Sequence, residues 1–301
     1  MNSKMSNKIA FLLTFLISMN LSKSVGQVQD KPLQIGLIAD IQYADKEDGK
    51  SRFYRSSIQK LEEAVIFLNQ ESILFNVVLG DLVDEGPKDL APILSRLNEL
   101  KAPHFNLLGN HDYPKEYQDK LFKTFQMDKD YYSLVKEGWK FIFLNTNELS
   151  SYAVKNGSKL EKEYIKLKSV LSTEGRQNVQ DWNGGIGSKQ LRWLEKELNS
   201  ADKKGLKVIV FSHHPFLPEN GLETLNNRVL IDLFVKHKAV KAVLSAHHHP
   251  GNFEMFKSVP FITLEGMVET KSNAFGYMSL FPNKLIIHGQ GRMTTREVSL
   301  R

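Results

Sequence analysis

The chain contains no cysteine. This absence excludes disulfide bonds, thiolate metal sites and cysteine nucleophiles. The 301 residues also contain no block of lysine and arginine, although the formal net charge is +6, so nothing in the sequence indicates nucleic-acid binding. Internal repeats and low-complexity linkers are missing too, which favours one large domain. Without disulfides, such a domain must be held together by its apolar core.

The first 26 residues are predicted to be a signal peptide. Lys4 and Lys8 precede an apolar run at residues 9–19, and small residues follow as far as Gly26. The run is shorter than the ~20 residues that a membrane-spanning helix needs, and no cysteine follows it to carry a lipid. We therefore predict export to the periplasm or the exterior, with no membrane contact after cleavage near Gly26. A single membrane anchor is the alternative.

Apolar stretches that predict β-strands alternate with helical patterns in the first part of the remaining chain. Residues 33–39, 75–79 and 104–108 are predicted as buried strands, and residues 51–69 and 90–100 have apolar side chains at helical spacing. This alternation is typical of an α/β domain whose parallel or mixed sheet is covered by helices.

The second half of the chain continues this pattern less regularly. Its expected elements are a hairpin of residues 131–135 and 140–144, helices at 155–176, 188–199 and 228–237, strands at 207–211 and 240–244, and further β runs at 261–264, 277–281 and 285–288. We predict one domain that extends over residues 27–301.

Polar side chains that bind metal ions follow directly after five of the predicted strands. Side chains at the carboxyl ends of strands are expected to meet in open α/β sheets. A dispersed set of carboxylate, amide and imidazole groups suits a two-metal hydrolytic site. The candidates are Asp40 and Gln42, Asp81 and Asp84, Asn110 and His111, His213 and His214, and His247, His248 and His249.

Several of these residues have simpler interpretations. Gly80-Asp81 after a strand is commonly only a turn, and Asp84 is better explained as a residue that orients a ligand or caps the next helix. His111 is predicted to lie near the metals without binding them, where it would donate a proton to a leaving oxygen.

The histidine runs contain both ligands and supporting residues. His213 is the expected ligand of its pair, and His214 would pack beside it or support it. Alternate side chains of an extended segment share one side, so His247 and His249 are expected to face the site and His248 to point away.

These motifs together resemble the calcineurin-like metallophosphoesterase superfamily, from residue 33 to the C-terminus. Gln42 stands where that superfamily usually has histidine. This replacement, together with Asn183-Gly184-Gly185 and the segment at residues 264–270, resembles the manganese-dependent ADP-ribose/CDP-alcohol diphosphatase family.

The resemblance implies a four-layer αββα fold, a β-sandwich of two mixed sheets flanked by helices. It implies two divalent ions, Mn²⁺ above all, with Mg²⁺, Zn²⁺ or Fe²⁺ as alternatives. Such ions lie ~3.5–4 Å apart and activate a water molecule that attacks a small-molecule phosphoester. One ion would be held by Asp40, Gln42, Asp81 and His249, and the other by Asp81, Asn110, His213 and His247, with His111 as the catalytic proton donor.

Two alternative functions stay open at this point. One is another phosphodiesterase or phosphomonoesterase of the same superfamily, and the other is a non-catalytic metal-binding surface protein. Arg52 and Arg55 would either contact a diphosphate or lie exposed at a helix start. The backbone of residues 183–185 would either bind an anion or form a plain turn. The oligomeric state is not indicated by the sequence.

Overall fold

The structure, a computed structural model, describes residues 31–301. The predicted signal peptide lies outside the described residues. Among the described residues, no helix combines the length and the apolar character needed to cross a membrane.

The first of two six-stranded sheets has the order β12-β11-β10-β1-β2-β3. Its strands β1, β2 and β3 run parallel. The largely apolar sequences of β1 and β2 suit strands that are covered on both faces. The C-terminal strands β10, β11 and β12 extend this sheet in antiparallel pairs. The bounds are Leu33–Ile38 for β1, Ile73–Leu79 for β2, His104–Leu107 for β3, Ala274–Leu280 for β10, Lys284–Gly291 for β11 and Arg296–Ser299 for β12.

The second sheet has the order β4-β5-β6-β7-β9-β8. Its inner strands β5, β6, β7 and β9 are parallel, and antiparallel β4 and β8 form its edges. The bounds are Tyr132–Lys136 for β4, Trp139–Phe143 for β5, Lys207–Phe211 for β6, Val240–Ser245 for β7, Asn252–Phe256 for β8 and Val259–Thr263 for β9.

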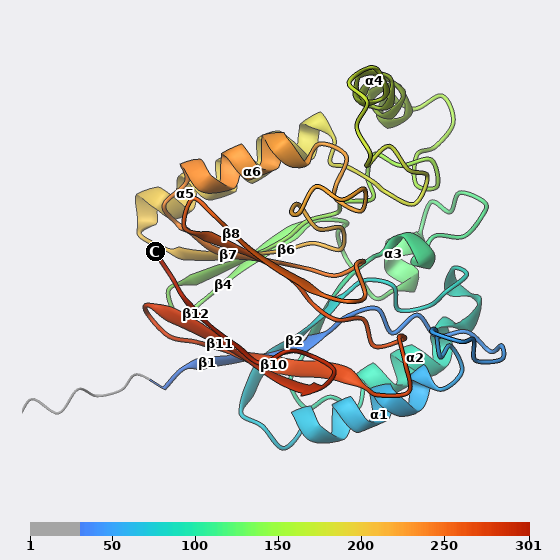
Figure 1. Cartoon of the computed structure of the whole chain (residues 1–301), viewed down its shortest axis with the longest axis vertical. Helices are drawn as coiled ribbons and strands as arrows, with labels where there is room; N and C mark the ends of the chain where they lie inside the picture. Colours follow the sequence, from blue (N-terminus) through green and yellow to red (C-terminus); the bar gives the residue numbers. More distant parts are fainter. Residues whose placement is uncertain (1–30) are drawn as a thin grey trace, which may run out of the picture. The chain divides into compact units, whose positions relative to one another are not determined.

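Helices cover the outer faces of both sheets, as Figure 1 shows. The helices α1 and α2 share an apolar cluster with the first sheet, and α5 and α6 share one with the second. A third cluster, rich in phenylalanine, fills the space between the sheets. The bounds are Ser57–Leu68 for α1, Leu90–Leu97 for α2, Leu121–Thr124 for the short α3, Lys159–Thr173 for α4, Ser188–Lys204 for α5 and Asn227–Lys236 for α6, with 3-10 turns at Pro87–Asp89 and Asn110–Asp112. The predicted αββα fold is confirmed.

One predicted helix begins later than expected. Residues 51–56 were included in it, but α1 begins at Ser57 because the preceding residues pair with a distant loop. Arg52 forms an antiparallel bridge with Glu269, and the Phe53 N–H donates to the Val268 carbonyl at 2.8 Å. This pairing brings a charged loop beside the candidate site.

Two short strands were missed by the sequence analysis. The residues of β8 and β12 are largely half-buried or exposed, because both strands lie at a sheet edge. Such strands lack the buried apolar run by which the inner strands are recognised.

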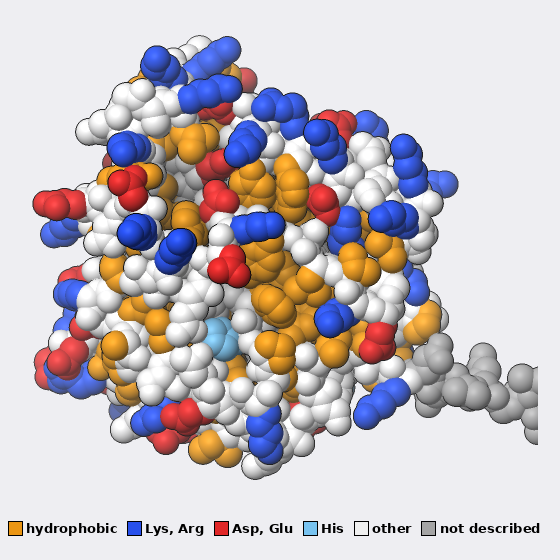
Figure 2. All heavy atoms as spheres, turned by 180° about the vertical axis from the view of Figure 1, so that it is seen from behind, with side chains coloured by type: hydrophobic (Ala, Val, Ile, Leu, Met, Phe, Trp, Pro, Cys, Tyr) orange, Lys and Arg blue, Asp and Glu red, His pale blue; other side chains and the backbone are white. Residues whose placement is uncertain are grey.

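The back of the molecule shows apolar side chains near its centre, surrounded by basic and acidic side chains (Figure 2).

Candidate metal centre

The candidate ligands come together where five strands end. The loops after β1, β2 and β3 of the first sheet meet the loops after β6 and β7 of the second. Parallel strands within a sheet have their carboxyl ends on the same side of that sheet. In both sheets these carboxyl ends face the same region of the molecule. The clustering of side chains that are distant in sequence follows from this topology.

One group of side chains consists of Asp40, Asp81 and His249, whose ligand atoms lie within 4.8 Å of one another. All three are buried. The His249 Nδ1–H donates to the Glu269 carboxylate at 3.1 Å, which leaves Nε2 at 3.7 Å from Asp40 Oδ1. A carboxylate behind the imidazole fixes the ring and its tautomer, as is common for metal-binding histidines.

Gln42 lies beside this group in a single defined orientation. Its Nε2 donates to Asp84 Oδ1 at 2.6 Å, so the amide oxygen points the other way. That oxygen is buried and has no hydrogen-bond partner. The carboxylate of Asp84 also accepts hydrogen bonds from Lys46 and from the His111 ring, so it orients two candidate functional residues together.

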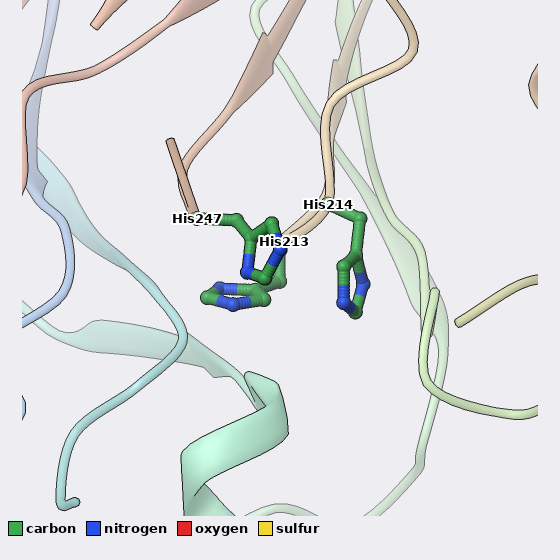
Figure 3. Close-up of side chains that lie close together, drawn as sticks. All are labelled: His213, His214 and His247. Carbon is green, nitrogen blue, oxygen red and sulfur yellow. The ribbon is translucent and has the colours of Figure 1, made fainter. Parts of the chain in front are cut away.

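A second group contains His213 and His247, with their ring centroids 5.1 Å apart (Figure 3). The Nδ1–H of His213 donates to the Leu79 carbonyl at 2.8 Å. Its Nε2 therefore lies free to accept, 3.5 Å from Asp81 Oδ2 and 3.2 Å from Asn110 Oδ1. Asp81 thus lies between the two groups, where one carboxylate could serve two ions.

His214 lies in the same cluster, as Figure 3 shows, but its hydrogen bonds differ from those of His213. Its Nε2–H donates to the Trp182 carbonyl at 3.1 Å, and its Nδ1 accepts from the Thr146 hydroxyl at 2.9 Å. Burial and the nearby His213 lower the pKa of His214 to about 3, so this ring is neutral. Since both nitrogens are engaged, the ring supports the cluster and has no free atom for an ion.

The His247–His249 segment is a turn and not the extended strand that the sequence analysis assumed. The backbone of His247 has a φ of 69°, and the His248 N–H donates to the Ala246 carbonyl across a tight turn. His247 and His249 consequently face different groups. His248 belongs to neither group, although it borders the cavity.

His111 is held at the edge of the cavity by Asp84. Its Nδ1 lies 3.0 Å from both the main-chain oxygen and the carboxylate of Asp84, which leaves Nε2 as the nitrogen for a substrate. Burial disfavours the charged ring, but Asp81 and Asp84 outweigh burial and raise the pKa of His111 to about 9. A protonated imidazole beside the candidate ligands suits a general acid.

The centre is chemically incomplete without a cation. Three buried atoms of the candidate ligands have no hydrogen-bond partner, namely Asp40 Oδ2, Gln42 Oε1 and His247 Nε2. Burial raises the pKa of Asp40, and burial together with neighbouring imidazoles lowers the pKa of His247 well below its usual value. Neutral imidazoles, carboxylates and an amide oxygen with free lone pairs fit divalent ions. The residues present therefore fit a two-ion site.

Other residues near the candidate ligands, among them Asp112 and the Asn183-Gly184-Gly185 segment, stabilise the loops instead. Asp112 is fully buried, and its carboxylate accepts from the Gly109 and Val83 N–H groups at 2.9 and 3.0 Å. In the Asn183-Gly184-Gly185 segment, the Asn183 amide donates to two carbonyls, and Gly184 packs so closely that a Cβ would lie 2.3 Å from the Thr146 carbonyl oxygen. Of the two interpretations of this segment, the geometry supports the packing turn.

A cavity of about 530 Å³ opens onto the candidate ligands. Beyond those ligands it is lined by Arg52, Trp182, Leu222, His248, Pro250 and Glu269. Arg55 is not among the lining residues, because it pairs with the exposed acids Asp45 and Glu47. The sequence analysis missed Trp182, Leu222 and the role of Glu269, since none of them lies in a motif of metal-binding residues.

Comparison with known proteins agrees with this geometry. The family model of the calcineurin-like phosphoesterases matches residues 33–251. The chain belongs to the calcineurin-like phosphoesterase family. It is therefore a metal-dependent phosphohydrolase with a two-ion centre, and the predicted family and enzyme class are confirmed.

Relatives of this phosphoesterase span nearly its whole length. Proteins named manganese-dependent ADP-ribose/CDP-alcohol diphosphatase are 31% identical in Mus musculus, over 87% of this chain and 91% of theirs, and 29% identical in Bos taurus, over 90% and 95%. The solved structure of a dimetal phosphatase from Danio rerio has the same fold, with a TM-score of 0.81, 24% identity and coverage of 90% of this chain and 100% of that one.

Proposed function

We propose that this phosphoesterase hydrolyses the diphosphate bond of nucleoside diphosphate-linked compounds of the ADP-ribose or CDP-alcohol type, with Mn²⁺ as its metal. The observation that carries the proposal is the orientation of Gln42. Asp84 holds its amide nitrogen, and its buried oxygen has no partner. An oxygen donor at this position favours harder ions such as Mn²⁺ or Mg²⁺. The names of the relatives support the same substrate class and metal.

In this proposal Asp40, Gln42, Asp81 and His249 hold one ion, and Asp81, Asn110, His213 and His247 hold the other. The bound ions would polarise the phosphoryl oxygens and activate water. His111 would donate a proton through Nε2 to the departing phosphate oxygen. Asp84 would keep the His111 ring in place through Nδ1.

A substrate panel tests the proposal. The purified protein would be assayed with Mn²⁺, Mg²⁺ and Zn²⁺ against ADP-ribose, CDP-choline, cyclic AMP, p-nitrophenyl phosphate and bis-p-nitrophenyl phosphate. We expect the diphosphate compounds to be hydrolysed best, with Mn²⁺ as the strongest activator. Turnover of the monoester alone, or of cyclic AMP alone, would contradict the proposal and favour the other members of the superfamily.

Replacing Asp84 with asparagine is expected to lower kcat/KM ~10–100-fold, the usual effect of losing a residue that orients a metal ligand. An asparagine can present its NH₂ group to Gln42 and His111, so it cannot hold both reliably. The matched control is Glu85→Gln, because Glu85 contacts the same Lys46 at 3.2 Å but neither Gln42 nor His111. Equal losses in both variants would show that the effect comes from Lys46.

Arg52 and Arg55 form a second matched pair. Arg52 borders the cavity, 3.6 Å from Glu269, and Arg55 faces exposed acids. Arg52→Ala should raise the KM for a diphosphate roughly 10- to 100-fold, as expected for one lost charge-assisted hydrogen bond. Arg55→Ala should leave that KM unchanged. Steady-state assays with ADP-ribose and p-nitrophenyl phosphate measure the KM of each variant. An equal KM rise for the two arginine variants would refute the assignment.

We also propose that residues 1–26 direct the protein out of the cytoplasm. The basic start and the short apolar run support this proposal. Cell fractionation and N-terminal sequencing of the mature protein test it. A cytoplasmic protein with an intact N-terminus would contradict it.

A further inference from the structure

We propose that Trp182 is a specificity-determining residue, whose indole stacks on the nucleobase of the substrate at the rim of the cavity. This inference rests on the proposed function, because it names the part of a nucleoside diphosphate that this rim would bind. Trp182 lies outside the two groups of candidate ligands and does not contribute to any of the quoted motifs.

Trp182 is 48% exposed, whereas Trp139, another of the three tryptophans in the chain, is 5% exposed. The third, Trp193, is partly buried and packs against the Tyr131 ring with centroids 4.8 Å apart. An indole that is half in water contributes little to the core. Its exposure on the wall of the cavity needs another explanation, and a binding role provides one.

The backbone beneath the indole is firmly fixed. The Trp182 carbonyl accepts the Nε2–H of His214 at 3.1 Å, and the His214 ring lies 4.5 Å from that of His247. The next residue, Asn183, is fully buried and donates to the carbonyl oxygens of Asn178 and Gly221 at 2.9 and 2.8 Å. The hydrogen bonds thus fix the main chain that carries the indole relative to the candidate metal ligands.

Leu222 adds a second apolar residue to the lining of the cavity. Its loop is held by Glu223, which is buried and accepts the N–H groups of Asn220 and Gly221 at 3.0 and 2.7 Å. The lining also includes the charged pair Arg52 and Glu269. The cavity therefore offers an apolar aromatic surface for a planar base and charged groups for the polar remainder of a nucleotide.

The chemistry favours a base over other ligands for this surface. Purine and pyrimidine rings both present a π-face, so one indole accommodates adenine and cytosine alike. Stacking on an aromatic side chain is worth ~1–3 kcal/mol per base, which is roughly 5- to 150-fold in affinity. A substrate with a base should therefore bind more tightly than one that has only the phosphate and the sugar.

The test compares AMP with ribose 5-phosphate, which has the same sugar and phosphate but no base. Binding to the Mn²⁺-loaded full-length protein would be followed by tryptophan fluorescence and by calorimetry. AMP should quench the wild-type fluorescence saturably, and ribose 5-phosphate should not. Trp182→Ala should weaken AMP binding roughly 5- to 150-fold and leave ribose 5-phosphate unchanged.

Two further variants separate stacking from structural damage. Trp182→Phe should keep most of the AMP affinity but lose the quenching, and Trp193→Phe should keep both. The inference is overturned if Trp182→Ala binds AMP normally, or if it loses AMP and ribose 5-phosphate equally. These binding measurements need no turnover, so a wild-type protein that binds AMP through Trp182 but leaves ADP-ribose and CDP-choline intact would refute the proposed function alone.

Discussion

Replacing His111 with alanine is expected to leave both metal ions bound and to slow turnover by ~10²–10⁴-fold, the usual contribution of a general acid. The ring contacts Asp84 through Nδ1 and presents Nε2 to the cavity, so its loss removes a proton donor. The nearby carboxylates raise the pKa of His111 to about 9 in the metal-free protein, against the effect of burial, and Asp84 favours the protonated ring through its contact with Nδ1.

The leaving group distinguishes this role from a structural one. A nitrophenolate departs without protonation, whereas a phosphate or alkoxide oxygen needs a proton. The His111→Ala enzyme should therefore be much less impaired with nitrophenyl substrates than with ADP-ribose. Metal content by mass spectrometry and single-turnover rates on both substrates measure this difference. Loss of metal, or equal slowing on both substrates, would refute the assignment.

Loss of one bound metal ion is the second large effect that we expect, and the three consecutive histidines at 247–249 provide the variants that test it. His247→Ala and His249→Ala should each reduce bound Mn²⁺ from two ions to one and lower activity by more than ~100-fold, beyond the 10–100-fold typical of supporting residues. The expected cause is that each imidazole faces a different group of ligands. Excess Mn²⁺ should partly restore the rate, because a site with one missing ligand still binds weakly.

His248→Ala is the matched control for both variants. This side chain borders the same cavity but belongs to neither group. It should keep two bound ions, as measured by calorimetric titration of Mn²⁺ into the metal-free protein. If His248→Ala lost an ion while either neighbour kept both, the proposed division of the segment would be wrong.

The fold was largely predictable because its inner strands are covered on both faces. Such strands require the continuous apolar runs seen in β1, β2, β6 and β7, and their order with the helices indicates a mixed sheet. The edge strands β8 and β12 were not predictable in this way, since most of their residues are half-buried or exposed. The start of α1 was misplaced because its preceding residues pair with Glu269, a contact that local sequence does not encode.

The candidate ligands were predictable because their chemistry is concentrated directly after strands. The residues that hold these ligands in place were less predictable. The motif predicted that Asp84 orients a ligand or caps a helix, but its contact with Gln42 was not predicted. The contact of Glu269 with His249 depends on a loop that is 20 residues away in sequence. The prediction that the His247–His249 segment is extended was wrong. A left-handed φ at a non-glycine residue is uncommon, and the sequence gives no signal for it here. Trp182 lies in a loop that becomes part of the cavity only through tertiary contacts.

The two sheets each contribute an incomplete share of the centre. The first sheet supplies the carboxylate and amide ligands together with His111, and the second supplies the imidazole ligands. In the proposed centre each ion would act as a cross-link between two halves that otherwise adhere through apolar packing. Removing the metal with a chelator should consequently make the five ligand-bearing loops more mobile, which faster amide hydrogen exchange in those loops would show. The phenylalanine-rich cluster between the sheets should keep its protection from exchange. Metal supply would thus set the rigidity of one end of the sandwich independently of its core.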